Sequence, residues 1–346
     1  MAKIVLGIGT SHTGMIDTPP DKWQAHGENF DMRLKELLSH KHDGSVTPYD
    51  KLLEEAGGRF DNMVGIERFT ENYHRLNAGA DELVKVIKEV KPDVAIVISD
   101  DQDEMLFEDN MPMFSVYWGD TYRIQPRIAR ANGAAMFGND EVAMDAPVDT
   151  ELGLHLIEYL ADHDFDIAHS RYMKEQYGGS IGPAGYVWWK RETAPRPQGI
   201  GHGYTFVVRR LMENSPCPVV PIIQNTCYPP NQPTPKRSYS LGKAVGEAVK
   251  AWDSDKTVMI VASGGLSHFV LDEELDRLVI RGMKEKNAEI LCSLPRQRLM
   301  SATSETLNWV AASGALEHLD MNLVDYVPSP RTPAGTGGGW AYAYWR

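Results

Sequence analysis

Short apolar runs rich in valine and isoleucine recur along the chain, each bounded by polar residues, glycine or proline. Runs of this length and composition are typical of β-strands that are buried in a sheet. The pattern therefore predicts strands at residues 3–9, 93–99, 114–118, 205–208, 219–223 and 257–262.

Amphipathic stretches lie between these runs. In residues 69–90 the apolar side chains recur at the spacing of a helix, and Pro92 stops the pattern just beyond them. Residues 240–252 and 273–286 show the same periodicity. Strands and helices in alternation predict an α/β fold, with a layered αβα arrangement around a mostly parallel or mixed sheet. Because the chain shows no internal repeat and no obvious linker, we expect a single domain over residues 1–346.

Two stretches interrupt the alternation. Residues 17–65 contain helical pieces broken by proline and glycine, and residues 173–200 are rich in glycine, proline and tryptophan. Long irregular segments in a compact domain are often functional. We expect both stretches to be insertions that cover a substrate site.

Composition narrows the class of protein. The net charge of −13 and the pI near 5.3 disfavour binding to nucleic acid or to anionic lipid. No apolar run reaches the ~20 residues of a membrane-spanning helix, and the first residues resemble a strand more than a signal peptide. Cys217, Cys227 and Cys292 are widely spaced, which favours reduced thiols over a disulfide framework or a zinc–thiolate site. We therefore expect a cytoplasmic protein that binds neither nucleic acid nor membrane.

Three histidines stand where a ligand site is expected. His12 follows the first predicted strand, and His268 follows the strand at residues 257–262. His202 lies between two glycines, just before the predicted strand at residues 205–208. In α/β sheets, ligands bind beyond the carboxyl ends of the strands. Each histidine alone could be a hydrogen-bonded structural residue, but together they indicate a site.

Other catalytic motifs are absent or weak. The chain has no GxGxxG loop between a strand and a helix, no Walker loop and no GxSxG elbow. Ser267 stands beside His268, but adjacent residues rarely direct their side chains at each other. A serine–histidine dyad is therefore the weaker interpretation.

Acidic residues supply further candidates. The strand at residues 93–99 is followed by Asp100-Asp-Gln-Asp-Glu104, a carboxylate cluster of the kind that binds a hard cation. Glu305 lies near the start of a predicted helix that ends by Gly314. The acidic cluster could equally be a set of solvated loop residues that bind no ion. Glu305 could lie near the helix N-terminus only because the helix dipole favours a carboxylate there.

Several segments carry a family resemblance: Ser11-His12, Asp100-Asp-Gln-Asp-Glu104, Asn110-Met-Pro112, Gly201-His-Gly-Tyr204, Pro229-Pro-Asn-Gln-Pro233, Ser263-Gly-Gly-Leu-Ser-His268, Glu305 with Trp309, and Gly335-Thr-Gly-Gly338. Together they resemble the class III extradiol ring-cleavage dioxygenases, with the catalytic beta subunit of protocatechuate 4,5-dioxygenase as the type. The resemblance extends over nearly the whole chain and is closest to the 3-O-methylgallate and gallate dioxygenase branch. The string from Ser263 to His268, followed by Asp272-Glu-Glu-Leu-Asp276, is the most specific part.

The resemblance implies a non-haem Fe(II) enzyme that opens a catechol ring with O₂. It implies that His12 and Glu305 bind the iron, that His268 is the catalytic acid/base, and that His202 hydrogen-bonds the substrate or the oxygen species. Two histidines and a carboxylate on one face of Fe(II) leave open positions for substrate and O₂. A near-neutral imidazole such as His268 suits proton transfer in both directions.

The chain departs from the family at the second iron-binding histidine. That histidine usually follows an Asn-Asp or similar pair, whereas here Asp100 and Asp101 are followed by Gln102. Alternation along an extended segment sends Gln102 and Glu104 to one side and Asp101 to the other. Glu104 as a ligand would add a negative charge that opposes a dianionic catecholate, whereas the amide oxygen of Gln102 is neutral. We therefore expect Gln102 to be the third ligand, with Glu104 orienting it and Glu104 or Asp101 as the alternative ligand.

The two insertions hold the remaining candidates. If neither Gln102 nor Glu104 binds iron, His40 or His42 would supply the third ligand. Side chains that could pack against the substrate ring or pair with its carboxylate are Trp23, Trp188, Trp189, Arg191 and Arg196, of which we favour Trp188 and Arg191.

The expected partners are O₂ and a small aromatic acid such as protocatechuate, gallate or 3-O-methylgallate. The resemblance also favours a homodimer. Two other functions remain open: a metal-dependent hydrolase that uses the acidic cluster with His268, and a non-catalytic binding relative of the same fold that has lost its iron.

Overall fold

The central feature of the fold is one large sheet. The computed structural model describes residues 1–29, 31–33, 44–102, 104–106, 110–124, 142–173 and 199–346. Within them, nine strands form a sheet in the order β10-β11-β1-β8-β2-β7-β3-β6, with β9 paired to β11, and β4 pairs with β5 separately. The strands are β1 (Lys3–Thr10), β2 (Val94–Asp100), β3 (Phe114–Tyr117), β4 (Thr121–Ile124), β5 (Met144–Pro147), β6 (Ala168–Ser170), β7 (Val219–Gln224), β8 (Thr257–Ser263), β9 (His268–Val270), β10 (Met321–Pro330) and β11 (Thr336–Trp345).

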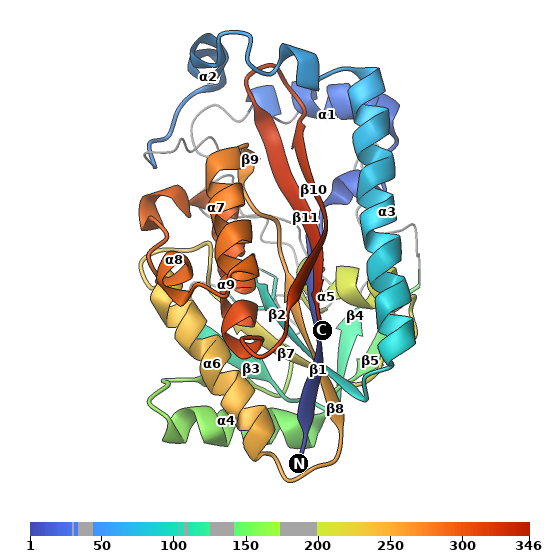
Figure 1. Cartoon of the computed structure of the whole chain (residues 1–346), viewed down its shortest axis with the longest axis vertical. Helices are drawn as coiled ribbons and strands as arrows, with labels where there is room; N and C mark the ends of the chain where they lie inside the picture. The colour runs from blue at the N-terminus through green and yellow to red at the C-terminus, as the bar shows by residue number, and fades with distance from the viewer. Residues whose placement is uncertain (30, 34–43, 103, 107–109, 125–141, 174–198) are drawn as a thin grey trace.

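The sheet is mixed, with helices on both faces. Strands β1, β8, β2 and β7 run parallel at its centre, whereas β11 is antiparallel to β1 and β3 is antiparallel to β7. Helix α3 covers one face, and α4, α6 and α9 cover the other (Figure 1), which confirms the predicted layered α/β fold. The α-helices are α1 (Trp23–Asn29), α2 (Tyr49–Ala56), α3 (Ile66–Val90), α4 (Thr150–Asp162), α5 (His202–Phe206), α6 (Pro235–Ala251), α7 (Glu273–Lys284), α8 (Ala288–Cys292) and α9 (Thr306–Ala315).

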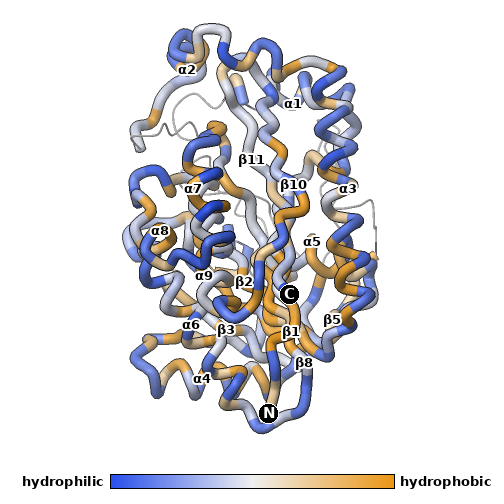
Figure 2. The backbone as a smooth tube through the Cα atoms, viewed as in Figure 1, coloured by the Kyte–Doolittle hydropathy of each residue, from blue (hydrophilic) through white to orange (hydrophobic). Residues whose placement is uncertain are grey.

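Alternation along the central strands produces two cores. On β2, Ile96 and Ile98 pack with residues of α4, α6 and α9, while Ala95 and Val97 pack with residues of α3 and α5. The backbone coloured by hydropathy shows the apolar residues concentrated in these central strands (Figure 2). Both faces of the parallel strands are thus buried, which explains why their sequences are continuously apolar.

The parallel strands end together at one edge of the sheet. Thr10 is level with Ser263 at the ends of β1 and β8, and Asp100 is level with Gln224 at the ends of β2 and β7. The loops that leave these ends carry most of the candidate site residues, as predicted for an α/β sheet.

One predicted strand is wrong. Residues 205–208 belong to α5 and to the π-helical turn η5 (Val207–Leu211) that continues it. These residues are buried, and all but Thr205 are apolar. A short buried apolar run cannot be assigned to strand or helix from its periodicity alone. His202 therefore begins a helix and does not precede a strand.

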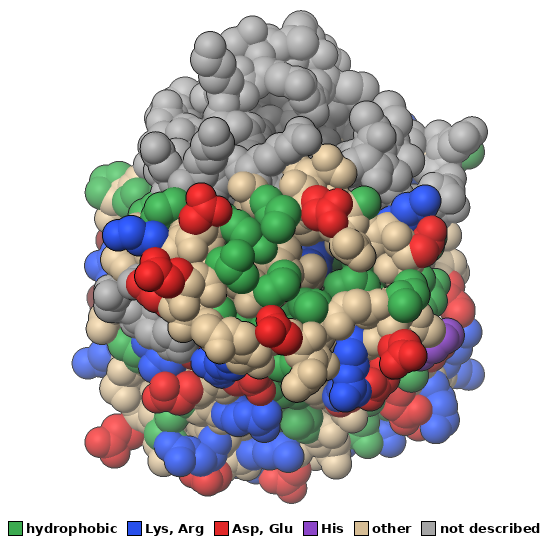
Figure 3. Space-filling view, turned by 90° about the horizontal axis from the view of Figure 1, so that it is seen from above, with side chains coloured by type: hydrophobic (Ala, Val, Ile, Leu, Met, Phe, Trp, Pro, Cys, Tyr) green, Lys and Arg blue, Asp and Glu red, His purple; other side chains and the backbone are tan. Residues whose placement is uncertain are grey.

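The N-terminal insertion packs on the tip of the β10–β11 hairpin. Asp31 forms a bidentate ion pair with Arg331, at 2.9 Å for both nitrogen–oxygen contacts, and both side chains are buried. Phe60 lies against Gly335 in the hairpin turn. Seen from this end, hydrophobic side chains are interspersed with acidic and basic ones (Figure 3). That the insertion covers a substrate stays a prediction, and residues 34–43, including His40 and His42, lie outside the described residues.

The sequence predicts no membrane-spanning helix. Among the described residues, none of the helices combines the length and the apolar character needed to cross a bilayer.

Candidate metal centre

Five polar side chains predicted from the sequence converge at the edge where the parallel strands end. His12 follows β1, Gln102 follows β2, and His268 is the first residue of β9. His202 begins α5, and Glu305 ends the short 3-10 helix η7 that leads into α9. All five side chains are buried. The structure thus brings together residues that are far apart in the sequence.

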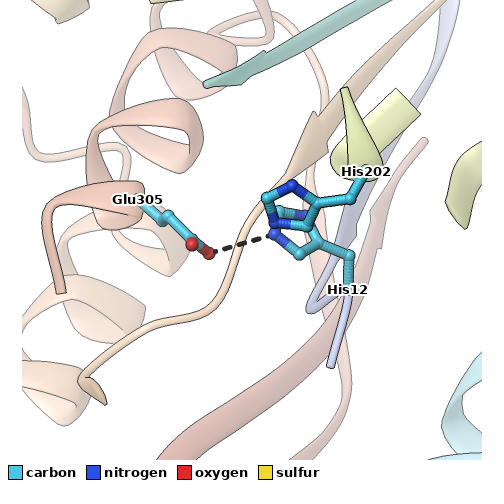
Figure 4. A group of neighbouring side chains, drawn as sticks. All are labelled: His12, His202 and Glu305. Carbon is cyan, nitrogen blue, oxygen red and sulfur yellow. Dashed lines mark ion pairs between the residues drawn. The ribbon is translucent and has the colours of Figure 1, made fainter. Parts of the chain in front are cut away.

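Glu305 lies at the centre of the group. Its Oε2 is 3.3 Å from Nε2 of His12, and its Oε1 is 3.3 Å from Nε2 of His268. Nε2 of Gln102 donates a hydrogen bond to Oε1 at 2.9 Å, and the backbone N–H of Gly265 donates to Oε2 at 2.7 Å. Figure 4 shows Glu305 facing the imidazoles of His12 and His202, whose ring centroids are 4.6 Å apart.

Glycines allow this close packing. A Cβ at position 203 would lie 2.1 Å from Oγ of Ser99 and 3.1 Å from the ring of His12. A Cβ at position 265 would lie 2.6 Å from Cε1 of His268. Gly203 therefore leaves room for the imidazole of His12, and Gly265 leaves room for that of His268.

The hydrogen bonds of His12 fix which ring nitrogen carries the proton. Nδ1 of His12 is 3.0 Å from Oγ of Ser263, and this hydroxyl donates its own proton to the carbonyl of Gly203 at 2.9 Å. Since the hydroxyl has one proton to donate, it accepts from Nδ1–H of His12. In the neutral form of His12, Nε2 consequently presents a lone pair to Glu305.

The other two histidines follow the same rule. Nδ1 of His268 is 2.8 Å from the carbonyl of Leu266, which only accepts, so Nδ1 carries the proton. Nδ1 of His202 is 2.9 Å and 3.0 Å from the two oxygens of Glu104, so it too donates. Each neutral imidazole therefore keeps Nε2 for a proton, a metal ion or a substrate, as in metal sites whose histidines are oriented by acceptors behind them.

The charges in this cluster oppose one another. Burial lowers the pKa of His12 and of His268, but the Glu305 carboxylate outweighs burial and raises both pKa values. Burial alone would raise the pKa of Glu305, but His268 and His12 hold it well below its usual range. Glu305 is thus an anion at neutral pH, and it favours a proton or another cation at Nε2 of each facing imidazole.

The donor atoms fit a metal ion. One ligand atom each from His12, His202 and Glu305 lies within 4.8 Å of the other two. Two imidazoles and a carboxylate with open positions are the ligands of non-haem Fe(II) oxygenases. The set differs from the one predicted, because it includes His202, which we expected to contact the substrate.

Gln102 faces the site with its amide nitrogen. Besides Glu305, Nε2 of Gln102 donates to Oδ2 of Asp100 at 3.0 Å. Two carboxylate acceptors around one amide group determine this orientation when no cation is present. Gln102 therefore orients Glu305 through this hydrogen bond. That Gln102 binds the metal stays a prediction.

The carboxylates of Glu104 and Asp101, in the turn after β2, accept hydrogen bonds from neighbouring residues. Glu104 accepts from both the backbone N–H and Nδ1 of His202, so it orients a histidine, while our prediction was that it orients Gln102. Asp101 accepts from the backbone N–H groups of Glu104, Met105 and Leu106, and burial raises its pKa to about 8. Asp101 thus holds the backbone of this turn, and Glu104 holds His202.

The structure also places two other sequence candidates, Ser267 and Trp23. Ser267 donates to Asp276, which agrees with our preference against a Ser267–His268 dyad. Trp23 is fully buried against Phe69. Residues 174–198, which include Trp188 and Arg191, lie outside the described residues.

Comparison with known proteins identifies the class to which this fold and site belong. Residues 63–335 match the family described as the catalytic LigB subunit of aromatic ring-opening dioxygenase. The chain therefore belongs to this family. The matched region includes Gln102, His202, His268 and Glu305, and His12 lies before it.

Similar curated proteins are named 2,3-dihydroxyphenylpropionate/2,3-dihydroxicinnamic acid 1,2-dioxygenase. The protein from Photorhabdus laumondii subsp. laumondii is 27% identical over 188 residues, which cover 54% of this chain and 46% of that protein. The protein from Rhodococcus rhodochrous is 27% identical over 177 residues, covering 51% and 44%. One from Rhodococcus sp is 24% identical over 266 residues, covering 73% and 70%. The chain thus spans about half the length of the first two relatives.

Proposed function

We propose that the protein is a non-haem, Fe(II)-dependent extradiol dioxygenase that opens the ring of a catechol-type aromatic acid with O₂. The observation that carries the proposal is the convergence of imidazole Nε2 atoms on one buried carboxylate, Glu305, in a chain of the ring-opening dioxygenase family. This donor set suits Fe(II).

The ion is proposed to bind between His12 and Glu305. Their facing atoms are Nε2 of an imidazole whose Nδ1–H is held by Ser263, and Oε2 of a carboxylate anion. Two residues can supply the third donor: His202, whose ring lies within the cluster, and Gln102, whose amide would turn its oxygen inward once a cation lies beside Glu305. When bound there, Fe(II) would supply the binding of the catechol and the activation of O₂.

His268 is proposed to move the protons. Its Nδ1–H is held by the carbonyl of Leu266, so Nε2 is the position that accepts a proton from a catechol hydroxyl and later returns it to the departing oxygen. The ring lies beside Glu305 but is oriented by its own loop and by Trp340, at a centroid separation of 5.2 Å. This separate support favours a role for His268 apart from the metal.

The substrate is proposed to be a catechol with a carboxylate side group. The relatives are named for 2,3-dihydroxyphenylpropionate, whereas the sequence motifs favour protocatechuate, gallate or 3-O-methylgallate. All of these share two adjacent hydroxyls and an acid group. Trp188 and Arg191 stay our candidates for contacting the ring and the acid, and a homodimer stays our expected assembly.

Anaerobic reconstitution with Fe(II), followed by measurement of O₂ uptake with each of these catechols, tests the proposal. We expect stoichiometric uptake with at least one substrate and loss of uptake after oxidation of the iron. Protein that holds no Fe(II) under these conditions, or holds it and consumes no O₂ with any catechol of the panel, would contradict the proposal and favour a non-catalytic relative.

A further inference from the structure

Asp276 is a buried carboxylate that the proposed chemistry does not use. It lies in the first turn of α7, its side chain is about fully buried, and no arginine, lysine or histidine of the described residues forms an ion pair with it. Burial raises its pKa to about 6, although hydrogen bonds from Tyr326 and Ser267 lower it. Because a buried acid without a cation disfavours folding, its presence calls for a reason other than stability.

The carboxylate is bonded to the residue next to His268. Oδ1 of Asp276 accepts from the backbone N–H of Ser267 at 2.8 Å, and Oδ2 accepts from the hydroxyl of Ser267 at 2.7 Å. The same Oδ2 accepts from the hydroxyl of Tyr326 at 2.7 Å. The hydroxyl oxygen of Ser267 in turn accepts from the backbone N–H of Asp272 at 2.8 Å. Asp276 thus binds both polar hydrogens of Ser267.

Further hydrogen bonds hold the backbone of His268 in place. Its N–H donates to Oγ1 of Thr303 at 3.0 Å, and that hydroxyl donates to the carbonyl of His268 at 2.8 Å. The carbonyl of Ser267 accepts from the backbone N–H of Gly339 in β11 at 2.8 Å. The imidazole itself is oriented by the carbonyl of Leu266, two residues back in the same loop. Any shift of this loop therefore moves the ring.

The surroundings are shaped to admit a carboxylate. A Cβ at position 339 would lie 2.0 Å from Oδ2 of Asp276, so glycine at this point of β11 leaves the space that the acid occupies. An amide would be a poor substitute for Asp276. Its NH₂ group would face a donor, either Ser267 N–H or the hydroxyls of Ser267 and Tyr326.

We propose that Asp276 is a positioning residue for His268: by holding Ser267 through two hydrogen bonds, it fixes the loop so that Nε2 of His268 points at the reaction centre. This role requires no contact of Asp276 with substrate or metal. The inference rests on the proposed function, since it assumes that His268 is the acid/base. It explains why a buried charge is kept at this place.

The test compares Asp276→Asn with Tyr326→Phe, which removes one hydrogen bond from Asp276 but leaves Ser267 untouched. In the iron-loaded protein, Asp276→Asn is expected to lower kcat by about 10- to 100-fold while KM and iron content stay within about twofold. Tyr326→Phe is expected to lower kcat by about threefold at most. Ser267→Ala, which keeps the backbone hydrogen bond, is the second variant and should fall between the two.

Two results would overturn the inference. One is an unchanged kcat in folded, iron-loaded Asp276→Asn or Ser267→Ala, which would leave Asp276 a purely structural residue. The other is an unchanged orientation of the His268 ring, relative to Glu305, in a crystal structure of Asp276→Asn. Because the crystal structure does not depend on turnover, it separates failure of this inference from failure of the proposed activity, which absent O₂ uptake by the wild type would reveal.

Discussion

Replacing His268 by phenylalanine separates proton transfer from metal binding. Phenylalanine fills the same space beside Trp340, where the ring centroids are 5.2 Å apart, so the loop should keep its packing. The substitution removes the Nδ1–H donor to Leu266 at 2.8 Å and the basic Nε2. Loss of the buried hydrogen bond should cost about 1–3 kcal/mol of unfolding free energy.

The kinetic effect should be much larger. Removal of an acid/base group lowers kcat by about 10²- to 10⁴-fold, equivalent to about 3–5 kcal/mol in the activation free energy. Iron content should be unchanged, since His12 and Glu305 remain. His155→Phe is a matched control, because Nε2 of His155 also bonds a backbone carbonyl, that of Ala248 at 2.8 Å, on the α4–α6 contact. This variant should lose some stability and no turnover.

The assay combines O₂ uptake by anaerobically loaded protein with iron analysis of the same sample. Loss of iron by His268→Phe, while the wild type and His155→Phe retain it, would make His268 a ligand and refute its assignment as the acid/base. Full turnover with full iron would refute any catalytic role.

Three further predictions concern other parts of the account. His12→Ala and Glu305→Ala should each fold but retain less than about a tenth of the iron of the wild type after desalting; stoichiometric iron in either variant would remove that residue from the ligand set. Gln102→Ala and His202→Ala identify the third metal ligand, because only the variant that lacks this ligand should lose iron. Gln102→His should keep or raise the affinity for Fe(II) in metal titrations. Asp31→Ala leaves its buried arginine partner unpaired and should lower the unfolding free energy in urea by about 3–5 kcal/mol, and a loss under about 1 kcal/mol would show that the pair does not fasten the insertion.

Much of the scaffold could be predicted because buried parallel strands are readable in a sequence. Apolar runs marked β1, β2, β3, β7 and β8, and helical periodicity marked α3, α6 and α7. The C-terminal hairpin was not predicted. β11 contains Gly337, Gly338 and Gly339, and these three glycines conceal the pattern of a strand. Trp340 and Asp276 occupy the space that side chains at positions 338 and 339 would fill.

The residues of the site could be predicted from the sequence, but their contacts with one another were harder to predict. Strand ends located His12, His268 and Gln102, since parallel strands finish at a common edge. The pairing of Glu104 with His202 depends on the start of α5, which periodicity did not reveal. The hydrogen bonds between Asp276 and Ser267 could not be predicted from the local sequence. They form only because α7 packs on β11 and on the loop before β9.

The measurement that tests the central claim most directly is isotope analysis of the product. The Fe(II)-loaded protein would be supplied with ¹⁸O₂ and a catechol acid that supports O₂ uptake, and the product examined by mass spectrometry under conditions that limit exchange with water. The account predicts a ring-opened product that contains both atoms of ¹⁸O₂. A product with no label, or an oxidised but intact ring, would contradict it.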